Sequence, residues 1–329
     1  MNALLNLVDV RALLRALIAS SFIICALANA EGFPNRPIKI LVGFPAGGTT
    51  DAVVRLMAQS ASKTLGQPVI IENRPGAGGA ISIVQMAHAA PDGYTLGLIT
   101  LAVFRSPVTQ DAGYDPIKDI TYVVRLTNVL FGVVVMSDSP WKTWQDFVAF
   151  ARSKPNDIAY GVPAGLGNSA HLLMEEVSAH ERVSWTVVPF KGSADLVQAL
   201  VGGHIKLSVD GSGGFGPLVD AGKARLLAVA SEERSTRWKE TPTLRELGYN
   251  VAVDSPWGIG GPKGLPPEVV KKIHDAFKKS LEDSAVLKLI EQFGQGIRYM
   301  GPEDYTRNAA ESYVEQRALL TKYGFAKDH

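Results

Sequence analysis

The sequence Gly43-Phe44-Pro45-Ala46-Gly47-Gly48-Thr49-Thr50-Asp51 separates a short apolar run, residues 38–42, from a segment with helical periodicity, residues 52–65. The apolar run is typical of a buried parallel strand, and the periodic segment is typical of an amphipathic helix. Thr49, Thr50 and Asp51 are residue types that cap helix N-termini. Adjacent glycines before a helix let its backbone N–H groups, which carry partial positive charge, approach a ligand closely. The stretch therefore predicts a strand–loop–helix site for an anion.

The same alternation of strand and helix patterns continues along most of the chain. Alternation of this kind predicts α/β domains with mostly parallel sheets, which bind ligands at the carboxyl ends of their strands. Residues 101–119 are expected to form a long loop, 244–248 a short helix and 251–260 a broken strand. Further strands are expected over 68–72, 94–100, 158–162, 185–188 and 205–210, and helices over 80–89, 144–152, 168–179, 194–201, 267–281, 284–293 and 302–323.

Two β-rich stretches predict that the chain crosses between two domains. Residues 120–126 and 129–136 form a nearly continuous β-branched run, long enough to pass from one sheet into another. Residues 226–230 are expected to be the return crossing. We therefore predict two α/β domains, the second inserted in the first. The first, discontinuous domain would comprise 31–128 and 229–329, and the second 129–228.

The N-terminus carries the pattern of a secretory signal. Arg11 and Arg15 precede an apolar run that ends in Ala28-Asn29-Ala30, an A-x-A cleavage site, and the run is too short to span a bilayer. Residues 1–30 are thus predicted to be a signal peptide, and the protein to be periplasmic. The only cysteine, Cys25, lies within this segment, without the small preceding residue of a lipidation site. We expect no disulfide and no thiol chemistry.

Charge balance argues against several classes of partner. The chain has 33 basic and 32 acidic residues, and removal of Arg11, Arg15 and Asp9 with the signal peptide leaves equal numbers of each. A net charge of zero provides neither a nucleic-acid footprint nor a basic membrane patch. We therefore expect no nucleic-acid partner.

Glycine-rich loops precede predicted helices at residues 43–51, 73–79 and 163–168. One such loop is weak support for a site, because α/β proteins need glycine at many turns. Three at strand ends imply several helix N-termini facing one cleft, each stabilising a bound anion by about 0.3–1 kcal/mol. A small anionic molecule is therefore the expected ligand.

Motifs for cofactors and catalysis are missing from the sequence. After Gly76 and Gly78, the third position of a dinucleotide fingerprint is Ile81, where glycine or alanine is needed. There is no phosphate-binding Gly-Lys-Ser/Thr, no G-x-S-x-G elbow, and no metal-like spacing of histidines. We expect no cofactor, no bound metal and no enzymatic reaction.

Single residues near the loops have both a binding and a structural interpretation. His171 follows the third loop and either faces the cleft or packs within its helix. Asp51 is expected to cap a helix rather than act as a base. Lys191 and, more weakly, Arg105 are candidate cations for a carboxylate, and Trp257 either walls the cleft or packs in a core.

Taken together, these segments resemble the Bug-type (TctC-like) periplasmic receptors of tripartite tricarboxylate transporters. The resemblance covers residues 33–325. It rests on FPAGGTTD (44–51), ENRPGAGG (72–79), PDGYTL (91–96), YGVPAGLGNSAHL (160–172), PFKG (189–192) and AGKARLLAVAS (221–231).

The resemblance implies a Venus-flytrap (periplasmic-binding-protein) fold, in which two domains with mostly parallel sheets close on a carboxylated solute. The implied partners are a small carboxylate and the membrane components of such a transporter, and the protein is expected to be a monomer. The implied ligand-binding residues are Phe44, Ala46, Gly47, Gly48, Thr49, Asp51, Ala77, Gly78, Gly79, Thr100, Ala164, Gly165, Asn168, Ser169, His171, Lys191 and Asp210.

Three functions remain open at this point. The first is a receptor that presents a di- or tricarboxylate, aromatic acid or acidic amino acid to a transporter. The second is an exported α/β enzyme acting on a small acid, which the absent catalytic motifs disfavour. The third is a periplasmic sensor that reports the same ligand to a signalling partner.

Overall fold

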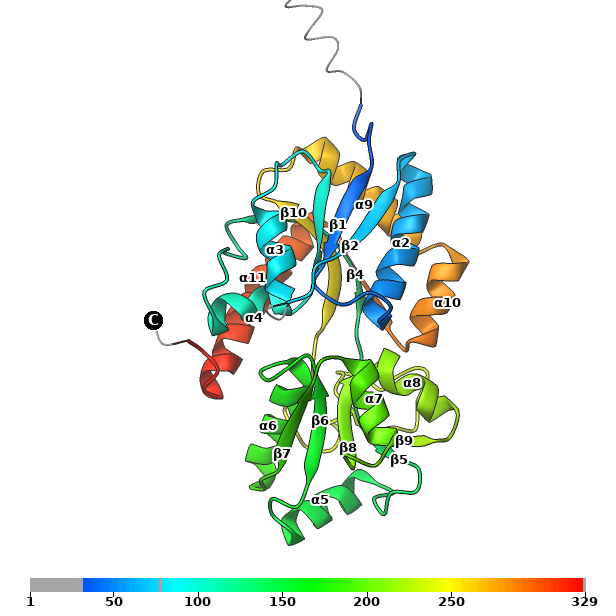
Figure 1. Ribbon diagram of the computed structural model, residues 1–329, viewed down its shortest axis with the longest axis vertical. Coiled ribbons are helices and arrows are strands. Elements are labelled where there is room, and N and C mark those ends of the chain that lie inside the picture. The colour runs from blue at the N-terminus through cyan, green and yellow to red at the C-terminus, as the bar shows by residue number, and fades with distance from the viewer. Residues whose placement is uncertain (1–31, 77–78, 328–329) are drawn as a thin grey trace, which may run out of the picture.

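The computed structural model describes residues 32–76 and 79–327. Within them the chain forms two lobes, each a sheet flanked by helices, joined by extended segments (Figure 1). The predicted signal peptide and two predicted site residues, Ala77 and Gly78, lie outside the described residues.

The first lobe is built on a six-stranded sheet with the order β11-β4-β10-β3-β1-β2. Strands β1, β2 and β3 are parallel, β10 is antiparallel to β3 and β4, and β11 is antiparallel to β4. The strands are β1 (Ile38–Val42), β2 (Val69–Asn73), β3 (Thr95–Ile99), β4 (Ile120–Asn128), β10 (Pro256–Pro262) and β11 (Gly296–Met300). The helices are α2 (Thr49–Leu65), α3 (Ala80–Ala87), α4 (Ala102–Thr109), α9 (Pro267–Ser280), α10 (Ser284–Gln292) and α11 (Pro302–Lys322).

The second lobe is built on a five-stranded sheet with the order β7-β6-β8-β5-β9. Strands β6, β7 and β8 are parallel, and β5 is antiparallel to both β8 and β9. The strands are β5 (Phe131–Met136), β6 (Ala159–Pro163), β7 (Thr186–Phe190), β8 (Leu207–Gly211) and β9 (Ala224–Val229). The helices are α5 (Trp144–Ser153), α6 (Ser169–Glu181), α7 (Ser193–Val201) and α8 (Ser212–Asp220). The predicted α/β fold of two helix-flanked sheets is confirmed, but both sheets are mixed rather than mostly parallel, because β10 and β11 in the first and β5 in the second pair antiparallel to their neighbours.

Local signals account for several helix ends. Thr143 and Asp146 form a capping box at the start of α5, so the backbone donors of both residues are satisfied. Helix α2 ends at Gly66, whose φ of 69° is the left-handed conformation that glycine adopts without steric cost. Pro267 and Pro302 lie in the first turns of α9 and α11, as predicted, where a missing N–H costs nothing.

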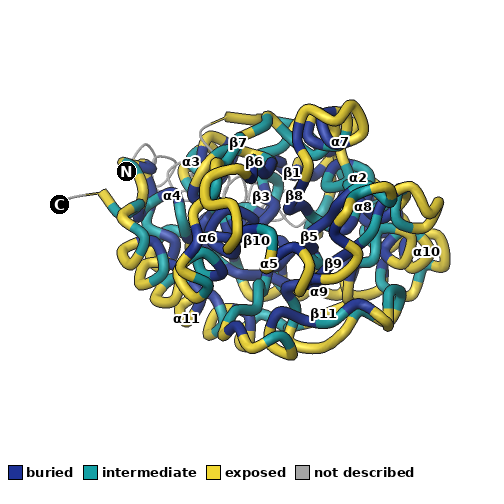
Figure 2. Tube along the Cα trace, turned by 90° about the horizontal axis from the view of Figure 1, so that it is seen from below, coloured by how far each residue is buried: buried dark blue, intermediate teal, exposed yellow. Residues whose placement is uncertain are grey.

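Each lobe has its own hydrophobic core. In the first, Ile40 and Val42 of β1 pack with Val53 of α2, all less than 2% exposed. In the second, Tyr160 of β6 and Leu207 of β8 are fully buried against neighbouring apolar residues. Figure 2 shows buried strands at the centre and exposed helix surfaces around them. Each lobe is therefore stabilised by apolar packing of its own.

The two crossing segments lie side by side between the lobes. Val129 donates its N–H to the carbonyl of Ser255 (2.9 Å), and the Ser255 N–H donates to Asn128 Oδ1 (2.6 Å). Residues 226–230, the expected return crossing, belong mostly to β9 of the second sheet. The chain stays with the second lobe beyond β9, because Leu244 and Tyr249 are buried in the second core. We propose that the inserted domain extends from about residue 129 to about residue 254.

Several predicted element boundaries are wrong. Residues 102–109 are a helix, not a loop, because burial of Val103, Phe104 and Val108 compensates for Pro107 near its end. Residues 244–248 form a turn rather than a helix, and residues 251–255 lie outside β10. Helix α8 and edge strand β11 were not predicted. The glycines and the proline of α8 have low helix propensity, so its sequence does not indicate a helix. Strand β11 is exposed along most of its length and lacks the alternation of apolar and polar residues that indicates a strand.

Candidate functional site

The predicted loops lie where the two lobes meet. Parallel strands end at a common edge, so the loops after β1, β2 and β3 lie together in one lobe, and those after β6, β7 and β8 lie together in the other. The lobes touch at this edge, because a Cβ built on Gly213 of α8 would overlap the side chain of Thr49. Figure 1 shows α8 close beneath α2.

The first loop is held in shape by Asp51. Its carboxylate accepts hydrogen bonds from the Gly47 N–H (3.0 Å), Asn73 Nδ2 (2.9 Å) and Arg55 Nη2 (2.7 Å). Although burial opposes the shift, these donors lower the pKa of Asp51 below its usual range. Helix α2 begins at Thr49 with Gly48 as its N-cap, so the prediction that Asp51 caps the helix is wrong. The Asp51 carboxylate instead stabilises the loop, and its oxygens already accept hydrogen bonds from protein donors rather than from a ligand.

The other predicted residues of the first loop remain accessible. Ala46, Gly47 and Gly48 are exposed, and Gly47 has a φ of 82° that favours glycine. Phe44 packs partly against the first core, and its carbonyl accepts a hydrogen bond from Asn73 (3.1 Å). The loop thus presents backbone groups and the first turn of α2, whose N–H groups have no partner within the helix.

The second loop lies directly against the first. A Cβ on Gly43 would lie 2.6 Å from the Cα of Gly79, so the absence of a side chain at residue 43 permits the contact. Gly79, with a φ of 97°, is the N-cap of α3. The Cβ of Ala102, in the first turn of α4, would lie 3.7 Å from a Cβ on Gly79. Gly43, Gly79 and Ala102 therefore form one wall at the end of β1 and β3.

In the third loop, the predicted side-chain ligands are used within the protein. Asn168 caps α6 by accepting the His171 N–H (2.9 Å), and its Nδ2 donates to the carbonyls of Pro163 and Gly165. His171 Nδ1 accepts the Gly167 N–H (3.0 Å), and burial lowers the pKa of His171 despite the nearby Glu175. Both side chains therefore shape the loop.

The backbone of the third loop is the part that can meet a ligand. Ala164 is exposed and has a φ of 58°, an uncommon left-handed conformation for a residue with a Cβ. Gly165 follows with a φ of 87°. Ser169, in the first turn of α6, is buried and accepts a hydrogen bond from Arg105 Nη1 of the first lobe (3.0 Å). This bond joins the lobes beside the loop.

The remaining predicted residues differ in their surroundings. Thr100 is buried at the end of β3, Lys191 is exposed, and Trp257 is buried in the first core. Asp210 is 1% exposed, and its Oδ1 accepts from Ser193 Oγ and from the Gly211 N–H, both at 2.7 Å. Its Oδ2 has no hydrogen-bond partner among the described residues and lies against Gly214 of α8. Asp210 therefore connects the starts of α7 and α8.

Asp210 is expected to make stability depend on pH. Burial raises its pKa to about 7, so the folded protein holds a proton that the unfolded chain, with a pKa near 3.8, releases. Its contribution to stability is greatest below pH 4 and is lost as the pH rises to 7. One pKa unit corresponds to about 1.4 kcal/mol. Raising the pH from 4 to 8 should therefore lower the free energy of unfolding of the unchanged protein by about 2–4 kcal/mol more than that of Asp210→Asn.

Urea unfolding of both proteins at pH 4 and pH 8 tests this expectation. Asp195→Asn, at an exposed position in the first turn of α7, is the matched control and should show no such pH dependence. An equal stability difference between Asp210→Asn and the unchanged protein at both pH values would contradict the assignment.

The start of α8 was not predicted from the sequence. Nor were Asn73 and Arg55, which hydrogen-bond to Asp51 and hold the first loop. Gly211-Ser212-Gly213-Gly214 lies at the junction of β8 and α8, just as the other glycine-rich segments lie between a strand and a helix, and this position was the available signal. Asn73 and Arg55 had no such signal, because each belongs to an ordinary strand or helix. Within residues 32–76 and 79–327 there is no cluster of metal-ligating side chains and no helix able to cross a membrane.

Two α/β lobes joined by paired crossing segments, with strand ends that meet at the boundary, define a solute-binding protein of the periplasmic-binding-protein fold. The chain belongs to the tripartite tricarboxylate transporter family of receptors, whose family model matches residues 53–325. Members of this family are solute-binding proteins and not enzymes.

Individual relatives agree with this assignment. The chain is 42% identical over 302 residues to the UPF0065 protein in the gbd 5′ region of Cupriavidus necator, covering 92% of each. It is 32% identical to BugT of Bordetella pertussis, covering 92% of this chain and 94% of BugT. A solved R. palustris structure with adipate is 30% identical with a TM-score of 0.82, covering 89% of this chain and 99% of that one.

Proposed function

We propose that this protein is a periplasmic receptor that captures a small carboxylate by closure of its two lobes. It then delivers the solute to the membrane components of a tripartite tricarboxylate-type transporter. The solute classes considered are di- and tricarboxylates, aromatic acids and acidic amino acids. The proposed binding groups are the backbone and hydroxyl groups of the three predicted loops. Asp51 holds the first of these loops in shape, and Asn168 and His171 hold the third.

The contact between Thr49 and Gly213 carries the proposal. It brings the start of α2 in one lobe against the start of α8 in the other, so an anion held at α2 is enclosed when the lobes meet. Closure excludes water, and electrostatic interactions are stronger where the dielectric constant is lower. The R. palustris relative with adipate supports a carboxylate as the solute.

Thermal unfolding with a panel of carboxylates tests binding. A ligand at about 100 times its Kd should stabilise the mature protein by about 2.7 kcal/mol, visible as a higher Tm. The panel comprises succinate, adipate, citrate, benzoate and glutamate, each paired with the amide that lacks its carboxylate charge. A carboxylate should raise the Tm while its amide does not. A Tm raised only by neutral or cationic solutes would contradict the proposal.

Uptake measurements test delivery. Cells that express the membrane components of such a transporter should accumulate a radiolabelled solute found in the binding panel only when the receptor is also present. Uptake that is the same without the receptor would contradict delivery without affecting the binding proposal.

A further inference from the structure

Arg105 lies where the two lobes meet. It belongs to the first turn of α4, immediately after the end of β3. Its Nε donates to Gln316 Oε1 of α11 (2.7 Å), and its Nη1 donates to Ser169 Oγ of α6 (3.0 Å). Gln316 therefore fixes the guanidinium from its own lobe, while Ser169 meets it from the other.

The charge of Arg105 has no counter-ion in the described part of the chain. Both of its hydrogen-bond partners are neutral, and no carboxylate lies within ion-pair distance of it among these residues. Burial lowers the pKa of Arg105 to about 10, which reflects the cost of keeping a cation away from water without an anion. Arg125, whose side chain is fully buried, is by contrast paired with Asp254. A positively charged side chain without a counter-ion from the protein is what a binding site for an anionic ligand requires, and Arg105 meets that requirement.

The neighbours of Arg105 belong to the predicted ligand site. Ala102 lies three residues earlier, on the same helical face, and packs beside Gly79 of the second loop. Ser169 follows directly after the third loop, at the N-terminus of α6, where the helix carries partial positive charge. That partial charge adds to the charge of the guanidinium, so both favour a negative group at this point.

We propose that Arg105 binds a second carboxylate of the solute and so makes the receptor selective for dicarboxylates. The inference rests on the proposed function, in which the loops around Thr49 hold the first carboxylate. The Nη2 group of Arg105 has no protein partner among the described residues, and it supplies the donors for a charge-assisted hydrogen bond. Gln316 acts as a positioning residue, since it orients the guanidinium without contacting the solute.

Calorimetric titration with adipate and with monomethyl adipate distinguishes a ligand-binding role of Arg105 from a purely structural one. The two probes share one carboxylate and a carbon chain, and differ in whether the second carboxyl group is charged. The unchanged protein should bind adipate at least tenfold more tightly than the monoester. Arg105→Gln should reduce this ratio to about one, chiefly by weakening adipate, and Arg105→Lys should retain part of the preference.

Arg317→Gln is the matched control, because it removes an exposed arginine next to Gln316 without touching the lobe boundary. It should keep the preference of the unchanged protein. If Arg105→Gln weakens adipate and its monoester equally, Arg105 only ties the lobes together and the inference is overturned. If the unchanged protein binds both probes equally, the inference fails while the proposed function stands. If it binds no carboxylate in the wider panel, both fail.

Discussion

Gly213→Val is expected to lower carboxylate affinity about 100-fold, which corresponds to about 2.7 kcal/mol, while leaving both lobes folded. A Cβ at this position would lie 2.8 Å from the Cβ of Thr49 and closer still to its outer atoms, so the lobes cannot adopt the observed contact. The nearest atoms all belong to Thr49, in the other lobe, so the second lobe itself need not adjust. The substitution therefore acts on closure rather than on folding.

Calorimetric titration with the best carboxylate of the panel measures the loss, and small-angle scattering should report a larger radius of gyration. Gly296→Ala is the matched control, because a Cβ at Gly296 of β11 meets no atom within 4 Å. Unchanged affinity in Gly213→Val would show that binding does not require the lobes to meet at this point.

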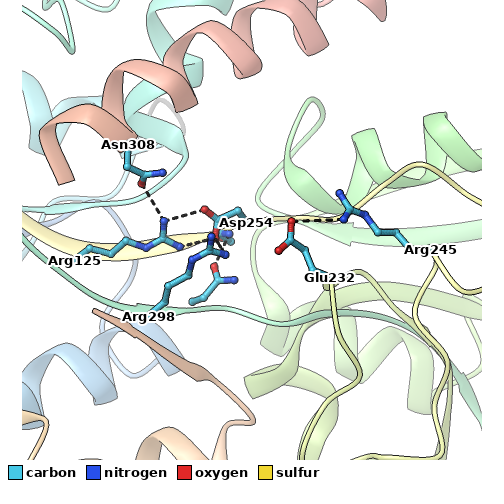
Figure 3. A network of polar contacts seen from close by, with 8 residues as sticks. Arg125, Glu232, Arg245, Asp254, Arg298 and Asn308 are labelled. Carbon is cyan, nitrogen blue, oxygen red and sulfur yellow. Dashed lines mark hydrogen bonds and ion pairs between the residues drawn. The ribbon is translucent and has the colours of Figure 1, made fainter. Parts of the chain in front are cut away.

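Asp254→Ala is expected to destabilise the protein by about 3 kcal/mol, because it leaves the buried charge of Arg125 without its counter-ion. The Arg125 side chain is 0% exposed, and both of its terminal nitrogens donate to Asp254, Nη1 at 2.8 Å. Asn308 Oδ1 accepts a further bond from Nη1 (3.0 Å). Figure 3 shows Arg125 and Arg298 converging on this carboxylate, which lies just before β10, and Asn308 contacting Arg125. We place the estimate at the low end because Asp254 is 35% exposed.

Urea unfolding measures this change. The urea concentration at the unfolding midpoint should fall, while the dependence of the free energy of unfolding on urea concentration stays the same. Asp304→Ala is the control, since Asp304 and its partner Arg307 are 67% and 68% exposed, and exposed pairs contribute less than about 1 kcal/mol. Arg125→Met combined with Asp254→Ala should recover much of the lost stability, because no charge then remains buried. If the double variant is no more stable than Asp254→Ala, the loss does not come from the orphaned arginine.

The periodic and turn-rich segments were predictable from sequence because their causes are local. The apolar run of β1, the glycines after it and the amphipathic pattern of α2 each specify a conformation within a few residues. The family resemblance extended this to two lobes and a set of loops. Helix α4 and helix α8 were missed because proline and glycine disfavour helices locally, while burial against the rest of the lobe stabilises them.

The sequence by itself determined that the chain has two α/β units with glycine-rich loops at strand ends and no catalytic motif. Only the tertiary structure decided how the polar side chains are used. It showed that Asp51, Asn168 and His171 hold the loops, and that Arg125 finds Asp254 across 129 positions of sequence. It also placed Arg105 beside Gln316, 211 positions away, without a carboxylate in reach among the described residues. The physical reason is that hydrogen-bond and charge satisfaction depends on which distant segments packing brings together, whereas backbone conformation depends largely on neighbouring residues.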